Sequence, residues 1–207
     1  MLAFSLAPAV AAGADFGVAK RAYDQADYAT ALKELTPLAE NGNAEAQVLL
    51  GTMYQKGQGV AKNSPLALKW FRAAAGQGNA DGQFQVGLAY LNGMAVAKNT
   101  PESVKWLKLA ANQGMRDAQL FLGLAYRNLR DAPQDFVQAY LWFELAALAG
   151  DPLAPRQRDA LGRLMTPAQV ANARAMAAAW KPTHTVKQAG EGSNSAPEPP
   201  QPSGHPR

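Results

Sequence analysis

The strongest constraint on this sequence is a phrase that returns at a fixed interval of 36 residues. The first copy reads G-N-A-E-A-Q-V-L-L-G-T-M-Y (42–54), and equivalents follow at 78–90 and 114–126. A period of about 20 to 50 residues is typical of a solenoid, in which each unit buries its apolar face only against its neighbours. The sequence therefore predicts a stacked array and not one closed core.

Several residue types keep this register in every copy. They are Gly51, Gly87 and Gly123; Tyr54, Tyr90 and Tyr126; Trp70, Trp106 and Trp142; and the alanine pairs at 74–75, 110–111 and 146–147. In each copy the apolar residues follow helical spacing in two segments, which predicts a pair of antiparallel helices. Glycine is unfavourable inside a helix, so its recurrence predicts close contact with a neighbouring helix.

The connections between paired helices contain turn and capping residues. The glycines in 56–65 and 92–101 are predicted to end the preceding helix in a left-handed conformation. Ser64 and Thr100, each followed by proline, are predicted to be N-caps. Gly57-x-Gly59 partly matches a phosphate-binding loop, but no strand precedes it, so a helix C-cap is favoured. In the third copy, Asp135 is predicted to cap the second helix.

These residues resemble the Sel-one-like repeat, a branch of the tetratricopeptide-like helical repeats. Residues 44–76 match its pattern almost completely, and 80–112 match with Ala95 in place of the second glycine. Residues 116–149 keep the signature, although Leu129 and Ala132 stand where glycine and valine are expected. The resemblance covers about half of the chain. It implies an all-α fold: a right-handed α-solenoid of antiparallel helix pairs with capping helices at both ends.

The chain divides around these repeats. The predicted segments are a signal peptide or flexible N-terminus (1–14), a degenerate leading repeat (15–41), three repeats (42–77, 78–113 and 114–150), C-terminal capping helices (151–182) and a disordered tail (183–207). Terminal units need atypical outer faces because those faces meet water. Thr166-Pro-Ala-Gln is predicted to open the last helix as a capping box, and similar endings occur in bacterial members of this family. The tail is rich in Gly, Ser, Pro, Gln and Glu, and is either inert or a proline-rich docking segment.

The N-terminal segment bears on where the protein resides. Residues 2–14 are apolar, uncharged and rich in small residues, which fits the core and cleavage region of a signal peptide. The basic start of such a peptide is missing, since no Lys or Arg precedes Lys20. We favour a periplasmic or secreted protein, with a cytoplasmic one as the alternative. No later apolar run is long enough to predict a membrane span.

Residues able to carry chemistry are scarce. The chain has no cysteine, and its two histidines, His184 and His205, fall in the predicted tail. The predicted ordered part therefore excludes thiol or histidine catalysis and His- or Cys-ligated metals. Carboxylate pairs at 24/27 and 131/135 could act as acid and base, but turn and cap roles are favoured. The net charge is +4 with scattered basic residues, which is not the footprint of a nucleic-acid binder. We expect no enzyme, cofactor or metal site.

By analogy with tetratricopeptide repeats, the resemblance implies a concave groove on the first helices. Its candidate residues are Val48, Thr52, Gln55, Phe84, Leu88, Leu91, Leu120, Leu124 and Arg127. Phe84, Leu88 and Leu91 form a stripe at helical spacing. The stripe either packs against the next repeat or holds a partner helix or extended peptide, with Arg127 at the rim.

The sequence predicts a non-catalytic scaffold or adaptor that binds another protein or peptide. An accessory factor of the cell envelope that recognises wall peptide or glycan is the main alternative. A hydrolase is a weaker one, because no residue supports it. The identity of the partner and the oligomeric state stay open.

Overall fold

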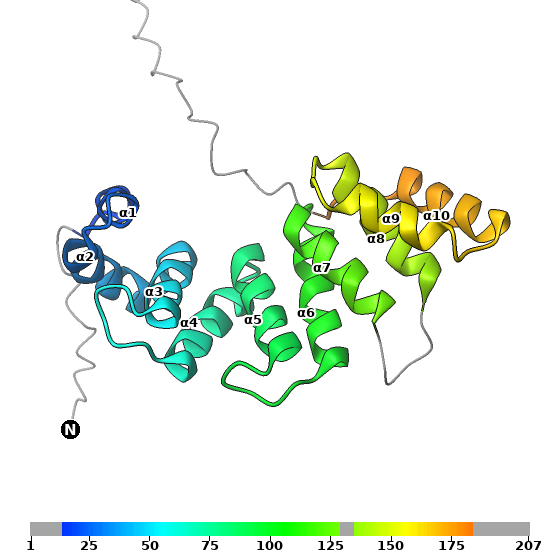
Figure 1. Ribbon diagram of the computed structural model, residues 1–207. Helices are drawn as coiled ribbons and strands as arrows, with labels where there is room; N and C mark the ends of the chain where they lie inside the picture. Colours follow the sequence, from blue (N-terminus) through cyan, green and yellow to red (C-terminus); the bar gives the residue numbers. More distant parts are fainter. Residues whose placement is uncertain (1–13, 129–134, 184–207) are drawn as a thin grey trace, which may run out of the picture.

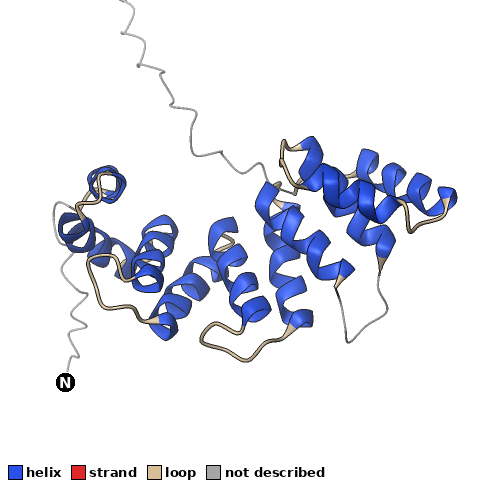
Figure 2. Ribbon diagram, viewed as in Figure 1, coloured by secondary structure: helices blue, strands red, loops and turns tan. Residues whose placement is uncertain are grey.

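A computed structural model describes residues 14–128 and 135–183 of the chain. Within these ranges all regular structure is helical, and no strand occurs (Figures 1 and 2). The helices are α1 (Phe16–Asp24), α2 (Tyr28–Glu40), α3 (Ala44–Lys56), α4 (Ser64–Gly76), α5 (Ala80–Asn92), α6 (Thr100–Asn112), α7 (Arg116–Arg127), α8 (Phe136–Leu148), α9 (Ala154–Gly162) and α10 (Pro167–Ala179). The all-α solenoid predicted from the repeat is confirmed.

The repeats are helix pairs that stack in chain order. Pairs α3–α4, α5–α6 and α7–α8 each pack internally, and each second helix also packs on the first helix of the next pair. Figure 1 shows the pairs following one another along an extended array. The apolar core is accordingly divided among clusters that follow one another along the chain. Tyr54 and Tyr126 each pack against two neighbouring clusters and so join them, whereas Tyr90 packs against one.

Asparagine or aspartate side chains cap helices α1 to α6 and α8. Asn63 caps α4 by accepting a hydrogen bond from the N–H of Leu66 at 3.0 Å, and Asn99 caps α6 in the same way. The prediction that Ser64 and Thr100 are the caps was therefore wrong by one residue. Asparagine reaches the third helical N–H from one position earlier, and the serine or threonine already lies in the helix. The predicted cap at Asp135 is confirmed, with its carboxylate accepting from the N–H of Gln138 at 2.9 Å.

The recurring glycines lie where helices approach each other closely. A β-carbon on Gly51 would lie 2.7 Å from Cε1 of Phe71, and one on Gly123 would lie 2.7 Å from Cδ1 of Phe143. The predicted close contact is confirmed. The C-cap predicted at Gly57 is also confirmed, because this residue has φ 74° in the left-handed region that favours glycine.

The range 15–41 contains a shorter helix pair. Asp27 caps α2 by accepting from the N–H of Thr30, so the turn between α1 and α2 lies beside it. α1 packs on α2, and α2 packs on α3. The array is therefore extended at its N-terminal end by two helices outside the three regular repeats.

The C-terminal helices close the array by folding back. α9 stands where the first helix of a fourth repeat would lie, since Ala154 follows the buried Ala118 by 36 residues and is itself buried. α10 begins with the predicted capping box at Thr166 and packs on α8. Its C-cap residue Trp180 meets Trp142 edge-to-face, with ring centroids 6.4 Å apart. Thr183 then donates to the carbonyl of Asn112 at the end of α6.

Some sequence predictions concern residues outside the described ranges. They are the N-terminal segment up to residue 13, the third connecting loop at 129–134 with Leu129, Asp131 and Ala132, and the tail from His184 through His205 to the end. They remain predictions from sequence.

Candidate binding surface and pocket

The predicted groove residues occupy equivalent positions on the first helices of the three repeats. With one acidic residue added at each N-terminal end, they form three rows. These are Glu45, Val48, Thr52 and Gln55 on α3; Asp81, Phe84, Leu88 and Leu91 on α5; and Asp117, Leu120, Leu124 and Arg127 on α7. Steps of three, four and three residues place each row on one side of its helix. We call these twelve positions the row surface.

The row surface is only partly available to a partner. Phe84 and Leu120 are 8 % and 7 % exposed. Phe84 packs edge-to-face on Phe121 of α7, with ring centroids 5.6 Å apart, and Leu120 joins the cluster of Phe143. The other seven predicted groove residues are half-buried. Phe84 and Leu120 thus have the contacts of core residues. The apolar residues of these two rows that stay partly exposed are Leu88, Leu91 and Leu124.

Polar side chains at the other end of the rows are tied to neighbouring elements. The side-chain amide of Gln55 lies 3.4 Å from the sulfur of Met94, in the loop between α5 and α6. The guanidinium of Arg127 donates to the side-chain oxygen of Gln157 on α9. Arg127, predicted at the rim of a groove, therefore joins the third repeat to the C-terminal helices.

The acidic ends of the rows were missed by sequence reasoning, although their 36-residue spacing was visible. Glu45, Asp81 and Asp117 lie in the first turns of α3, α5 and α7, where the helix dipole favours negative charge. The Asp81 residue as a whole is exposed, yet the protein around its carboxyl group partly desolvates it and raises its pKa. The charges of Asp117 and Glu45 raise the pKa further. The charges on the neighbouring rows thus act on Asp81 across the repeats.

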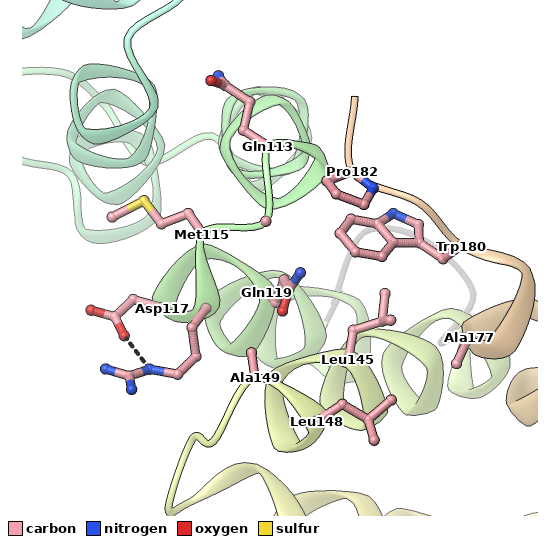
Figure 3. A pocket seen from close by; sticks show the side chains of 12 residues that line it. Gln113, Met115, Asp117, Gln119, Leu145, Leu148, Ala149, Ala177, Trp180 and Pro182 are labelled. Carbon is pink, nitrogen blue, oxygen red and sulfur yellow. Dashed lines mark hydrogen bonds and ion pairs between the residues drawn. The ribbon is translucent and has the colours of Figure 1, made fainter. Parts of the chain in front are cut away.

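A pocket of about 600 Å³ adjoins the third row, with which it shares Asp117, and lies between the α6–α7 turn, the end of α8 and α10 (Figure 3). It is lined by Gln113, Gly114, Met115, Arg116, Asp117, Gln119, Leu145, Leu148, Ala149, Ala177, Trp180 and Pro182. Figure 3 shows Gln119 in the middle of this group, with Trp180 and Leu145 on one side and Met115 on the other. Because these residues come from two repeats and the C-terminal cap, no single motif in the sequence points to the pocket.

Each repeat has a buried glutamine at the same register position, and the glutamine of the third repeat, Gln119, lines this pocket. Gln47, Gln83 and Gln119 are 36 residues apart, and all are buried. Gln47 accepts a hydrogen bond from Gln77, and Gln83 accepts one from Gln113, both at 2.8 Å. The third donor is absent, because position 149 is alanine. Among the described residues, Gln119 Oε1 and Trp142 Nε1 are the buried side-chain polar atoms without a hydrogen-bond partner.

Other candidate chemistry resolves into structural roles. Asp24 pairs with Lys20 at 2.6 Å, and Asp27 caps α2. No cluster of three or more metal-ligating side chains occurs among residues 14–128 and 135–183. In the same part of the chain, no helix has the length and apolar character needed to cross a membrane.

Comparisons with known proteins match the repeats directly. A family model described as the Sel1 repeat, the Sel-one-like repeat named above, matches residues 44–79, 80–115 and 116–151. A Sel1 repeat protein from Oxalobacter formigenes is 30% identical, with a TM-score of 0.68 over 79% of this chain and 70% of its own. A protective antigen of uropathogenic Escherichia coli strains displaying an SLR fold is 28% identical, with a TM-score of 0.53 over 72% of this chain and 40% of its own. No curated protein matches the chain.

Proposed function

Because the chain belongs to the Sel1 repeat family, we propose that it is a non-catalytic scaffold that holds a segment of a partner protein against its row surface. Sel1 repeat proteins generally act as scaffolds for protein–protein interaction. The observation that carries the proposal is the acidic residue that begins the row on each of the three first helices, together with the apolar residues that follow it on two of them. All three following positions are apolar on α5 and two of the three on α7, whereas α3 has one, Val48.

The pattern indicates the chemistry of the partner segment. Leu88, Leu91 and Leu124 are half-buried and offer apolar area, whereas the carboxylates lie at one end of the rows. The raised pKa of Asp81 means that its ionised form is disfavoured by its surroundings, so a nearby cation would relieve this cost. An amphipathic helix or extended segment with apolar residues toward the leucines and basic residues toward the carboxylates fits both features.

We expect the double substitution Leu88→Glu and Leu91→Glu to weaken partner binding by about tenfold or more, since charged groups would replace apolar contacts near the centre of the surface. Partners crosslinked to tagged full-length protein in native cells would be identified by mass spectrometry. The affinity of the leading partner would then be measured for wild type and variant, with circular dichroism to verify the helical content.

Leu109→Glu is the matched control, because Leu109 is an exposed leucine on the second helix α6 and lies outside the row surface. It should leave the affinity unchanged. Unaltered binding by a folded double variant would exclude the row surface as the binding site.

We further propose that residues 1–14 direct export, so that the partners would be proteins of the cell envelope. The support is the uncharged, apolar and small-residue-rich sequence of this segment. Residues 1–20 fused to a phosphatase that is active only outside the cytoplasm should confer activity, and Leu6→Arg should abolish it by interrupting the apolar stretch. Equal activity of both fusions, together with an intact Met1 in the purified native protein, would contradict export.

A further inference from the structure

We propose that the pocket between α7, α8 and α10 recognises a carboxamide side chain, that of glutamine or asparagine, on a partner peptide with an apolar residue beside it. The inference rests on the proposed function, because it assumes that the chain binds a peptide segment. It adds a second contact point next to the row surface, with which the pocket shares Asp117, and specifies the chemistry of the group that enters it.

The first two repeats contain the hydrogen bond that such a ligand would supply in the third. In the first two repeats the buried glutamine accepts a hydrogen bond from another glutamine side chain thirty residues later, at the same 2.8 Å. In the third repeat that donor is replaced by Ala149. The backbone at Ala149 (φ −79°, ψ 6°) nearly coincides with that at Gln77 (φ −89°, ψ 3°) and Gln113 (φ −80°, ψ 0°). The backbone conformation at this register position is therefore kept, and the side-chain carboxamide is missing.

The orientation of Gln119 directs its unpaired oxygen toward the missing group. The Gln119 Nε2 atom donates to the carbonyl of Ala111 at 3.4 Å, as Gln47 Nε2 donates to the carbonyl of Ala39. Turning the amide over would bring two oxygens together at Ala111, so this orientation is the favoured one. The side chain is 2 % exposed, and its Oε1 has no partner among the described residues. A buried carbonyl oxygen without a donor is unfavourable, and a ligand N–H would satisfy it.

The walls of the pocket suit an apolar neighbour of that carboxamide. Leu148 is 73 % exposed at the end of α8, and Trp180 lies half-buried across the pocket. A lysine ammonium is a poorer fit for the donor, because the group that fills this place in the first two repeats is a neutral carboxamide and the pocket lining already includes the cation of Arg116. A neutral N–H donor flanked by a hydrocarbon side chain satisfies the oxygen and covers the exposed apolar area.

Ala149→Gln is the direct test of the geometry, because it would supply the missing donor from within the chain. The melting temperature of the full-length protein should rise by about 2–4 °C, the shift expected for one added net hydrogen bond in a chain of this size. Gln77→Ala, which creates the same gap in the first repeat, should lower it. No rise for Ala149→Gln would show that position 149 does not reach Gln119, and would overturn the proposal.

Binding is tested with a phage-displayed random heptapeptide library selected on immobilised full-length protein. Selected peptides should contain Gln or Asn next to a leucine or aromatic residue. A synthetic peptide from this set should bind the Ala149→Gln variant at least tenfold more weakly than wild type. Replacing its carboxamide residue by the isosteric Glu or Asp should cause a similar loss, because a carboxylate has no N–H to donate.

The outcomes separate this inference from the scaffold function. Peptides that lack a carboxamide, or that bind wild type and Ala149→Gln equally, would overturn the pocket assignment. If those same peptides lost affinity on Leu88→Glu and Leu91→Glu, the scaffold proposal would still stand. A change of oligomeric state on Ala149→Gln, without any effect on peptide binding, would assign the pocket to a second copy of the chain and overturn the peptide assignment.

Discussion

Replacing Trp142 by alanine is expected to lower the free energy of unfolding by about 3 kcal/mol, near the lower end of the range of about 3–5 kcal/mol for buried aromatic residues. Trp142 is 3 % exposed and belongs to a cluster with Leu107 and Leu122. The lower end is expected because its indole N–H is buried without a partner, a cost that the substitution removes. Equilibrium unfolding in guanidinium chloride, followed by circular dichroism, measures the change.

The matched comparison is Trp70→Ala, at the equivalent position two repeats earlier. Trp70 is half-buried and therefore loses less area on truncation, so about half the cost of Trp142→Ala is expected. The two tryptophans differ because Trp180 packs on Trp142. An equal or larger loss at Trp70 would contradict the conclusion that the C-terminal helices bury the third repeat more completely than the others.

The repeated helix pairs were predictable because every constraint that defines them recurs in the sequence. The glycine at 51, 87 and 123 could be assigned to a helix contact because nothing else explains a residue of low helix propensity in that register. The first-turn caps were less predictable. Asparagine and serine are adjacent at 63 and 64, both are good N-caps, and only the backbone path decides which of them lies outside the helix.

The helices of the C-terminal cap could be predicted from the sequence, but the elements against which they pack could not. Trp180 follows Trp142 by 38 residues, so it lies outside the repeat register, and no periodicity indicates that α10 returns to α8. The same limit applies to the candidate site. A stripe such as Phe84, Leu88 and Leu91 looks identical in sequence whether it packs inside the array or faces a partner. The structure separates the buried Phe84 from the half-buried leucines.

The pocket shows what a departure from the repeat pattern can indicate about structure. The alanine at 149 is visible as a departure from the glutamines at 77 and 113. Its meaning depends on a side-chain pair thirty residues apart, which only the stacked helices reveal. Departures from a repeat pattern are thus informative once the contacts of the regular copies are known.

Gly82→Ala is the second substitution with a large expected effect, and the sequence alone suggests the opposite. Position 82 is in register with Ala46, Ala118 and Ala154, so alanine should be tolerated there. In the structure, however, a β-carbon on Gly82 would lie 2.7 Å from the backbone nitrogen of Ala75 and 3.0 Å from the carbonyl oxygen of Phe71. Backbone atoms within a helix cannot move aside singly, so α5 would have to shift away from α4.

Overpacking of this kind costs about 1–3 kcal/mol, and the better helix propensity of alanine offsets up to about 1 kcal/mol of it. We expect a net loss of about 1–2 kcal/mol in the free energy of unfolding, measured by denaturant titration. Gly76→Ala is the control, since a β-carbon there would meet nothing within 4 Å, and it should be neutral or slightly stabilising. Equal stability of the two variants would mean that the α4–α5 junction is as open as the equivalent junctions. A loss confined to Gly82→Ala would mean that repeats equivalent in sequence are stacked at unequal distances.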